Sequence, residues 1–181
     1  MAEMIFAGFG GQGVMSMGMM VAYAGMIEEK NVSWIPSYGP EMRGGTANCA
    51  VVVTPDEIGS PIITEPEIVV AMNLPSLNKF EPSLKPGGLL IYNSSLIQRE
   101  EGREDITVIA VPANDIAGEL GNSRVANMVI MGTLLAKTEV VSIDSIKAAL
   151  RQVLPAHRHD LLDVNEEAME RGSEYATRDV P

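Results

Sequence analysis

Four glycines cluster near the start of the chain in "FAGFGGQGV", where Gly8, Gly10 and Gly13 match the pattern G-x-G-x-x-G. The pattern follows an apolar run and precedes a helical stretch, which is the context that gives it weight. In such a turn the first glycine permits a tight bend, the second lets a phosphate approach the backbone, and the third lets helix and strand pack closely. Free amides at the helix start then favour an anion. The turn therefore either binds a phosphate-bearing ligand or is only a compact packing device.

A second stretch, "PSYGPEMRGGTANC" at residues 36–49, contains Arg43, the only arginine before Arg99. Its glycines and prolines fix the backbone geometry, and adjacent glycines leave room for a ligand or another chain. Arg43 can hold a phosphate or carboxylate through a forked pair of hydrogen bonds, and a surface ion pair with Glu41 is the alternative. Loops that follow the first two strands of a doubly wound sheet lie at the same edge, so we expect both loops to face one anion.

A dinucleotide-binding enzyme usually carries an acidic residue at the end of its second strand, about 20 residues beyond the glycines. Here the run "NVSWIPS" ends in Pro36, Ser37 and Tyr38, while Glu28 and Glu29 precede it. The missing acid makes a free-standing NAD(P)-dependent dehydrogenase the weaker alternative. A scaffold module whose glycine loops only pack against a neighbour is a third interpretation.

Short apolar runs alternate with helical stretches along the chain, and this alternation is typical of an α/β fold with a parallel sheet. Nearly continuous apolar runs favour strands covered on both faces. We expect strands at residues 4–9, 31–37, 46–54, 67–73, 87–93 and 106–112. We expect helices at 14–27, 127–138 and 142–154, the last with Ser142 as N-cap, and a surface helix from 161 that ends near Gly172. The prediction is a Rossmann-like, three-layer αβα sandwich with a mostly parallel sheet.

The 181 residues, 46% of them hydrophobic, suffice for one ordinary core, so we expect a single domain spanning 1–181. A formal net charge of −11 argues against nucleic-acid and anionic-membrane partners, which need a basic face. The sequence has no apolar run of about 18 residues and no basic segment leading into an apolar one at its start. We therefore expect a soluble, cytoplasmic protein.

Groups for covalent or metal chemistry are scarce in the sequence. Cys49 is the only cysteine, so the chain by itself forms no disulfide and holds no four-cysteine iron–sulfur cluster. Free cysteines are often buried, and we expect Cys49 to be a small core residue. His157 and His159 lack a metal-binding spacing, and we expect neither a catalytic residue nor a metal in the chain. Residues 14–27 have little polar face, which predicts either an obligate interface or ordinary core packing.

The segments "GFGGQGV" and "SYGPEMRGG" together resemble the gamma subunit, or gamma domain, of the 2-oxoacid:ferredoxin oxidoreductases, which act on pyruvate, 2-oxoisovalerate or 2-oxoglutarate. "NMVIMGTLLA" and "VNEEAMERG" are also similar, so the resemblance covers essentially the whole chain. It implies a subunit of a complex that oxidatively decarboxylates a 2-oxoacid, passes electrons to ferredoxin and transfers the acyl group to coenzyme A. The smaller subunit of indolepyruvate oxidoreductase shares this motif family and is an alternative.

The same resemblance places thiamine diphosphate and the [4Fe-4S] clusters in other subunits, namely alpha, beta and a ferredoxin-like subunit. For this chain it implies a structural role and help in binding coenzyme A between two walls. One wall would comprise Gly8, Gly10, Gly11, Gln12 and Gly13, and the other Ser37, Tyr38, Gly39, Glu41, Arg43, Gly44 and Gly45. Coenzyme A carries several phosphate charges, which suit glycine amides and an arginine.

Overall fold

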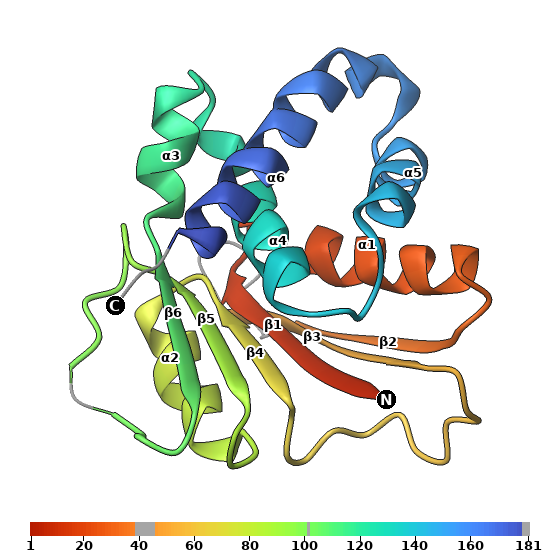
Figure 1. Ribbon diagram of the computed structural model, residues 1–181, viewed down its shortest axis with the longest axis vertical. Helices are drawn as coiled ribbons and strands as arrows, with labels where there is room; N and C mark the ends of the chain where they lie inside the picture. The colour runs from red at the N-terminus through yellow and green to blue at the C-terminus, as the bar shows by residue number, and fades with distance from the viewer. Residues whose placement is uncertain (39–45, 101, 179–181) are drawn as a thin grey trace.

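A computed structural model of the protein describes residues 1–38, 46–100 and 102–178. In this part the chain forms a six-stranded sheet in the order β2-β3-β1-β4-β5-β6 (Figure 1). The strands are β1 (Ala2–Phe9), β2 (Asn31–Tyr38), β3 (Thr46–Thr54), β4 (Ile68–Ala71), β5 (Leu89–Asn93) and β6 (Thr107–Val111). β3 runs against its neighbours β1 and β2, and the other strands share one direction. The sheet is therefore mixed but mostly parallel, as predicted.

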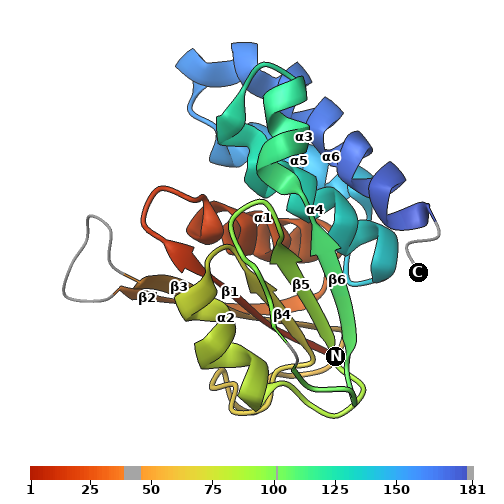
Figure 2. The ribbon, with the colours of Figure 1, turned by 90° about the vertical axis from the view of Figure 1, so that its left-hand side faces the viewer.

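Helices lie on both faces of the sheet. They are α1 (Val14–Ile27), α2 (Leu74–Phe80), α3 (Ala113–Glu119), α4 (Ala126–Lys137), α5 (Ile143–Val153) and α6 (Leu162–Thr177), with short 3₁₀ helices at Glu81–Ser83, Ser123–Val125 and Ala156–Leu161. α2 lies on one face, and the other α-helices lie on the opposite face (Figures 1 and 2). On that face α5 packs against α1, and α6 packs against α4. None of the described helices combines the length and apolar character that crossing a membrane requires.

Each face of the sheet has its own apolar core, because successive side chains of a strand point to opposite faces. In β1, Met4 and Phe6 belong to the larger core beneath α1 and α4. Their neighbours Ile5 and Ala7 belong to the smaller core on the α2 side. This double coverage is the physical reason why the β1 segment is an unbroken apolar run.

The register of β3 aligns the ends of β1 and β2. Ala47 pairs with Gly8 on one side and with Tyr38 on the other, so the two strand ends are level. On the other side of β1, Ala7 pairs with Ala71 of β4. The turn after β1 and the end of β2 therefore lie at one edge of the sheet, as the sequence predicted.

Helix α1 has the bounds predicted from the sequence, and its apolar character is explained by packing within the chain. It lies between the sheet and α5. A methyl group on Gly18 would come within 2.4 Å of Cys49 Sγ, so this glycine lets the helix lie directly on β3. Of its large apolar side chains, the exposed ones are Tyr23, Met26 and Ile27 near its end. This burial favours core packing over a subunit interface for most of the helix.

The prediction that the last helix ends near Gly172 is wrong. α6 continues to Thr177, and Gly172 lies inside it. A methyl group on Gly172 would come within 1.9 Å of the Val129 carbonyl oxygen in α4, and one on Gly132 within 1.9 Å of the Met169 carbonyl oxygen in α6. These glycines bring two helix backbones into contact, and this packing outweighs the low helix propensity of glycine.

Candidate functional site

The glycine turn joins β1 to α1 through backbone conformations that favour glycine. The backbone N–H of Gln12 donates to the Phe9 carbonyl oxygen at 3.1 Å, and this hydrogen bond closes the turn. Gly11 has a φ of 97° and Gly13 a φ of 75°, both in the left-handed region. Gly13 is also the residue from which α1 begins. A side chain at either position would strain the turn.

Gly8 and Gly13 serve packing inside the protein. A methyl group on Gly8 would lie 2.7 Å from Gln12 Oε1 and 2.9 Å from Met72 Cβ, and one on Gly13 would lie 2.4 Å from Asn127 Nδ2. Their place in the pattern is therefore explained by contacts with the turn itself, with the end of β4 and with the start of α4.

Gly11 differs from these two glycines. Within the described residues, no atom lies within 4 Å of a methyl group built on Gly11. Gly10, beside it, is exposed. These two residues form the part of the turn whose backbone is open to a ligand, next to the first amides of α1.

The side chain of Gln12 is occupied by contacts that hold the turn in place. The Phe9 amide donates to Gln12 Oε1 at 2.7 Å, and Gln12 Nε2 donates to the Met72 carbonyl oxygen at 3.0 Å. Asn73 Nδ2 also donates to Gln12 Oε1, at 3.4 Å. Gln12 therefore ties the turn to the end of β4 and acts on any ligand by shaping the turn.

Of the second predicted wall of the coenzyme site, residues 37–45, the structure describes only the first two residues. Ser37 and Tyr38 end β2. They are separated from β1 by the width of β3, or about 10 Å at the usual strand spacing. The remaining predicted residues, Gly39, Glu41, Arg43, Gly44 and Gly45, lie outside the described residues. The structure thus places the start of this loop at the same edge of the sheet as the glycine turn. The contacts of Arg43 remain a prediction.

The sheet order disfavours a nicotinamide dinucleotide. In dinucleotide-binding folds the second strand pairs directly with the first, and its terminal acid reaches the ribose. Here β3 separates β1 from β2. Glu28, which precedes β2, already has hydrogen-bond partners within the protein. Its carboxylate accepts from Lys30 Nζ at 2.8 Å and from the backbone N–H of Ser142 at 2.7 Å. Burial alone would raise the pKa of Glu28, but these hydrogen bonds lower it to about 2.

Cys49 is a small core residue, as predicted. Its side chain is 0% exposed, and its Sγ donates to the Val14 carbonyl oxygen at 3.5 Å. Burial raises the pKa of the thiol to about 12, so the nucleophilic thiolate is scarce at neutral pH. Among the described residues, no three histidine, cysteine, aspartate or glutamate side chains gather in a metal-binding cluster.

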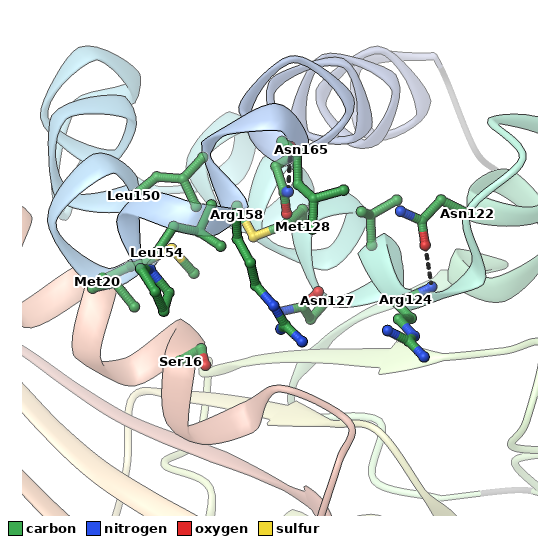
Figure 3. A pocket seen from close by; sticks show the side chains of 14 residues that line it. Ser16, Met20, Asn122, Arg124, Asn127, Met128, Leu150, Leu154, Arg158 and Asn165 are labelled. Carbon is green, nitrogen blue, oxygen red and sulfur yellow. Dashed lines mark hydrogen bonds between the residues drawn. The ribbon is translucent and has the colours of Figure 1, made fainter.

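A pocket of about 390 Å³ opens beside the glycine turn, between α1, α4, α5 and the segment 155–165 (Figure 3). Ser16 from the first turn of α1 and Asn127 from the start of α4 line it, together with Arg124 and Arg158. Because Asn127 also contacts Gly13, pocket and turn are continuous. These residues were not predicted from the sequence. One local signal was available for Asn127, a polar residue in the first turn of a mostly apolar helix.

Comparison with known proteins gives one consistent family. The family model described as "Pyruvate ferredoxin/flavodoxin oxidoreductase" matches residues 3–175. The ketoisovalerate oxidoreductase subunit VorA of Methanothermobacter marburgensis is 37% identical over 96% of this chain and 36% of its own length. The chain thus spans about a third of that relative.

Two solved structures share the fold. The gamma subunit of a keto/oxoacid ferredoxin oxidoreductase from Geobacter sulfurreducens superimposes with a TM-score of 0.83 at 28% identity, covering 97% of this chain and 98% of that one. A 2-oxoglutarate:ferredoxin oxidoreductase from Magnetococcus marinus, with 2-oxoglutarate, coenzyme A and succinyl-CoA bound, gives a TM-score of 0.89 at 24% identity. That match covers 97% of this chain and 31% of the other.

Proposed function

The chain belongs to the pyruvate ferredoxin/flavodoxin oxidoreductase family as a gamma-type chain, and we propose that it works within a 2-oxoacid:ferredoxin oxidoreductase complex. The complex would oxidatively decarboxylate a 2-oxoacid, reduce ferredoxin and transfer the acyl group to coenzyme A. The family match over 3–175 and the agreement with a gamma subunit along its whole length support this proposal. The comparisons give no support to an indolepyruvate enzyme or to a free-standing dehydrogenase.

The redox chemistry would belong to alpha, beta and ferredoxin-like subunits of a cytoplasmic complex. Thiamine diphosphate and the [4Fe-4S] clusters would be bound there, and ferredoxin would accept the electrons. A four-cysteine cluster needs four thiolates, and this chain has one cysteine, which is buried and has a pKa raised to about 12. The residues of this chain therefore do not fit such a cluster.

For this chain we propose a role in holding coenzyme A at the edge where β1 and β2 end. The observation that carries the proposal is the register of Ala47 with both Gly8 and Tyr38, which aligns the two glycine-rich segments. Open backbone at Gly10 and Gly11, beside the first amides of α1, suits a phosphate group of the coenzyme.

The other predicted residues would complete the site. Gly8, Gln12 and Gly13 shape the turn, and Arg43 would pair with a second phosphate from the loop after β2. Ser37, Tyr38, Gly39, Glu41, Gly44 and Gly45 would form the rest of that wall.

Reconstitution tests the proposal. The complex is assembled from all of its subunits with and without this chain, and coenzyme A-dependent reduction of ferredoxin is measured with pyruvate, 2-oxoisovalerate, 2-oxoglutarate and indolepyruvate. We expect activity with pyruvate, 2-oxoisovalerate or 2-oxoglutarate, and only when the chain is present. Equal activity without the chain, or activity with indolepyruvate alone, would overturn the proposal.

A further inference from the structure

Asn73 is a buried polar residue that joins the end of β4 to the glycine turn. It is the N-cap residue of α2, and its side chain is 4% exposed. Its Oδ1 accepts from the backbone N–H of Ser76 at 2.8 Å. Because this bond uses the oxygen of the amide, Nδ2 is left to donate, and it donates to Gln12 Oε1 at 3.4 Å. One side chain therefore caps a helix and contacts the turn at the same time.

The side-chain amide of Gln12 is held in one orientation. Its Oε1 accepts from the backbone N–H of Phe9 at 2.7 Å, and its Nε2 donates to the Met72 carbonyl oxygen at 3.0 Å. Turning the amide over would place Nε2 against two donors, the N–H of Phe9 and Nδ2 of Asn73. It would also place Oε1 against a carbonyl oxygen. Asn73 thus adds a second donor that opposes this rotation.

This orientation matters for the backbone that is open to a ligand. Phe9, whose N–H is held by Gln12 Oε1, directly precedes the two exposed glycines of the turn, Gly10 and Gly11. Glycine has more backbone freedom than any other residue, so two adjacent glycines need contacts from outside to stay in one conformation. The hydrogen bonds of Gln12 supply these contacts from the end of β4.

We infer that Asn73 is a positioning residue for coenzyme A, an inference that rests on the proposed function. Asn73 acts through Gln12, whose fixed amide keeps Gly10 and Gly11 in the conformation that receives a phosphate group. A turn held in this conformation before binding loses less conformational freedom when the coenzyme binds. Removal of the donor on Asn73 therefore weakens binding of the coenzyme and leaves the reaction of the bound complex unchanged.

Asn73→Ser tests the inference, because serine also caps helices but lacks the amide donor that reaches Gln12. In the assembled complex the change is expected to raise the KM for coenzyme A by about fivefold and to leave kcat within about twofold of the wild type. Asn73→Asp keeps the cap and places an oxygen where Nδ2 donates, so it should raise the KM further. Loss of folded protein alone would lower kcat and leave the KM unchanged. An unchanged KM in both variants would overturn the inference.

Asn93→Ser is the matched control. Asn93 is a buried asparagine at the end of β5, 0% exposed. Its Nδ2 donates to Asn114 Oδ1 at 2.7 Å, and its Oδ1 accepts from the backbone N–H of Ser95 at 3.3 Å. Within residues 1–38, 46–100 and 102–178, neither bond involves the glycine turn. The KM of this variant should equal that of the wild type, and a rise as large as that of Asn73→Ser would contradict a specific role for Asn73.

A double-mutant cycle shows whether Asn73 acts through Gln12. Gln12→Ala alone is expected to raise the KM for coenzyme A at least as much as Asn73→Ser. In the Gln12→Ala background, Asn73→Ser should raise the KM no further, since the contact that it removes is already lost. If the two fold-changes multiply in the double variant, Asn73 acts by another route and the inference fails.

Arg43→Ala in the same assay separates this inference from the proposed function. If Arg43→Ala raises the KM for coenzyme A while Asn73→Ser and Asn73→Asp do not, the inference about Asn73 fails and the proposed function stands. If none of these variants moves the KM, both fail.

Discussion

Gly13 lies directly against Asn127, so that a methyl group on Gly13 would come within 2.4 Å of Asn127 Nδ2. The start of α1 therefore packs on the start of α4, although the two helices are far apart in the sequence. This contact joins the glycine turn to the neighbouring pocket and makes them one continuous surface. Gly13, like Gly8, therefore packs against other residues of the protein, whereas Gly10 and Gly11 are exposed.

Gly13→Ala and Gly11→Ala are expected to differ in their effect on the free energy of unfolding. Both positions have a positive φ, which costs a side chain about 1 to 2 kcal/mol. Gly13→Ala also forces Asn127 away and should cost at least about 1 kcal/mol more. Urea unfolding measures both values, and equal losses would show that the contact with Asn127 is easily relieved.

The crossing of α4 and α6 gives a prediction about Gly172. A methyl group there would meet the Val129 backbone at 1.9 Å, and Thr133 Oγ1 already donates to the Gly172 carbonyl oxygen at 3.0 Å. Gly172→Ala should therefore lower the free energy of unfolding by about 3 kcal/mol, since neither backbone can yield cheaply.

Gly118→Ala is the matched control for this change. Gly118 lies within α3 at a helical position, and a methyl group on it meets no atom within 4 Å among the described residues. The change should stabilise the protein by about 0.5 to 1 kcal/mol. Similar values for both variants would contradict the close packing of α4 on α6.

The strands and α1 could be predicted from the sequence because local pattern determines them. Continuous apolar runs mark strands buried on two faces, and α1 has few polar residues because the sheet and α5 cover it. The length of α6 could not be predicted, because Gly172 acts through a contact with Val129, distant in the chain. Arg124 and Arg158 were missed for a similar reason. They come from separate segments, and only helix packing brings them to one pocket.

Glu28 links the end of α1 to the start of α5 and makes stability depend on pH. Its folded-state pKa is lowered from an ordinary 4.5 to about 2, so its contribution is complete above about pH 4.5 and is lost as the pH falls toward 2. Glu28→Gln should lower the free energy of unfolding at neutral pH by about 1 to 2 kcal/mol, because it removes the charged partner of Lys30.

The difference between the wild type and Glu28→Gln should shrink as the pH is lowered from about 7 to about 3. Glu29→Gln, which removes the same charge from the neighbouring residue, should show a much smaller effect at both pH values. A difference for Glu28→Gln that does not change with pH would contradict the lowered pKa.

The thiol of Cys49 should resist alkylation in the folded protein. Its side chain is fully buried and its pKa is raised to about 12. At about pH 8 this pKa alone lowers the thiolate fraction by roughly a thousandfold relative to an ordinary cysteine. Mass spectrometry after iodoacetamide treatment measures the rate, with the urea-unfolded chain as reference. Comparable rates in the two states would show that β3 does not shield the thiol.

The most direct measurement of the central claim is a coenzyme A titration of the assembled complex in a 2-oxoacid-dependent ferredoxin reduction assay, comparing wild type, Arg43→Ala and Gly11→Ala. If this chain holds coenzyme A at the edge where β1 and β2 end, both variants raise the KM for coenzyme A by about tenfold while the complex stays assembled. A KM equal to that of the wild type in both assembled variants would contradict the account and leave the glycine segments as packing devices.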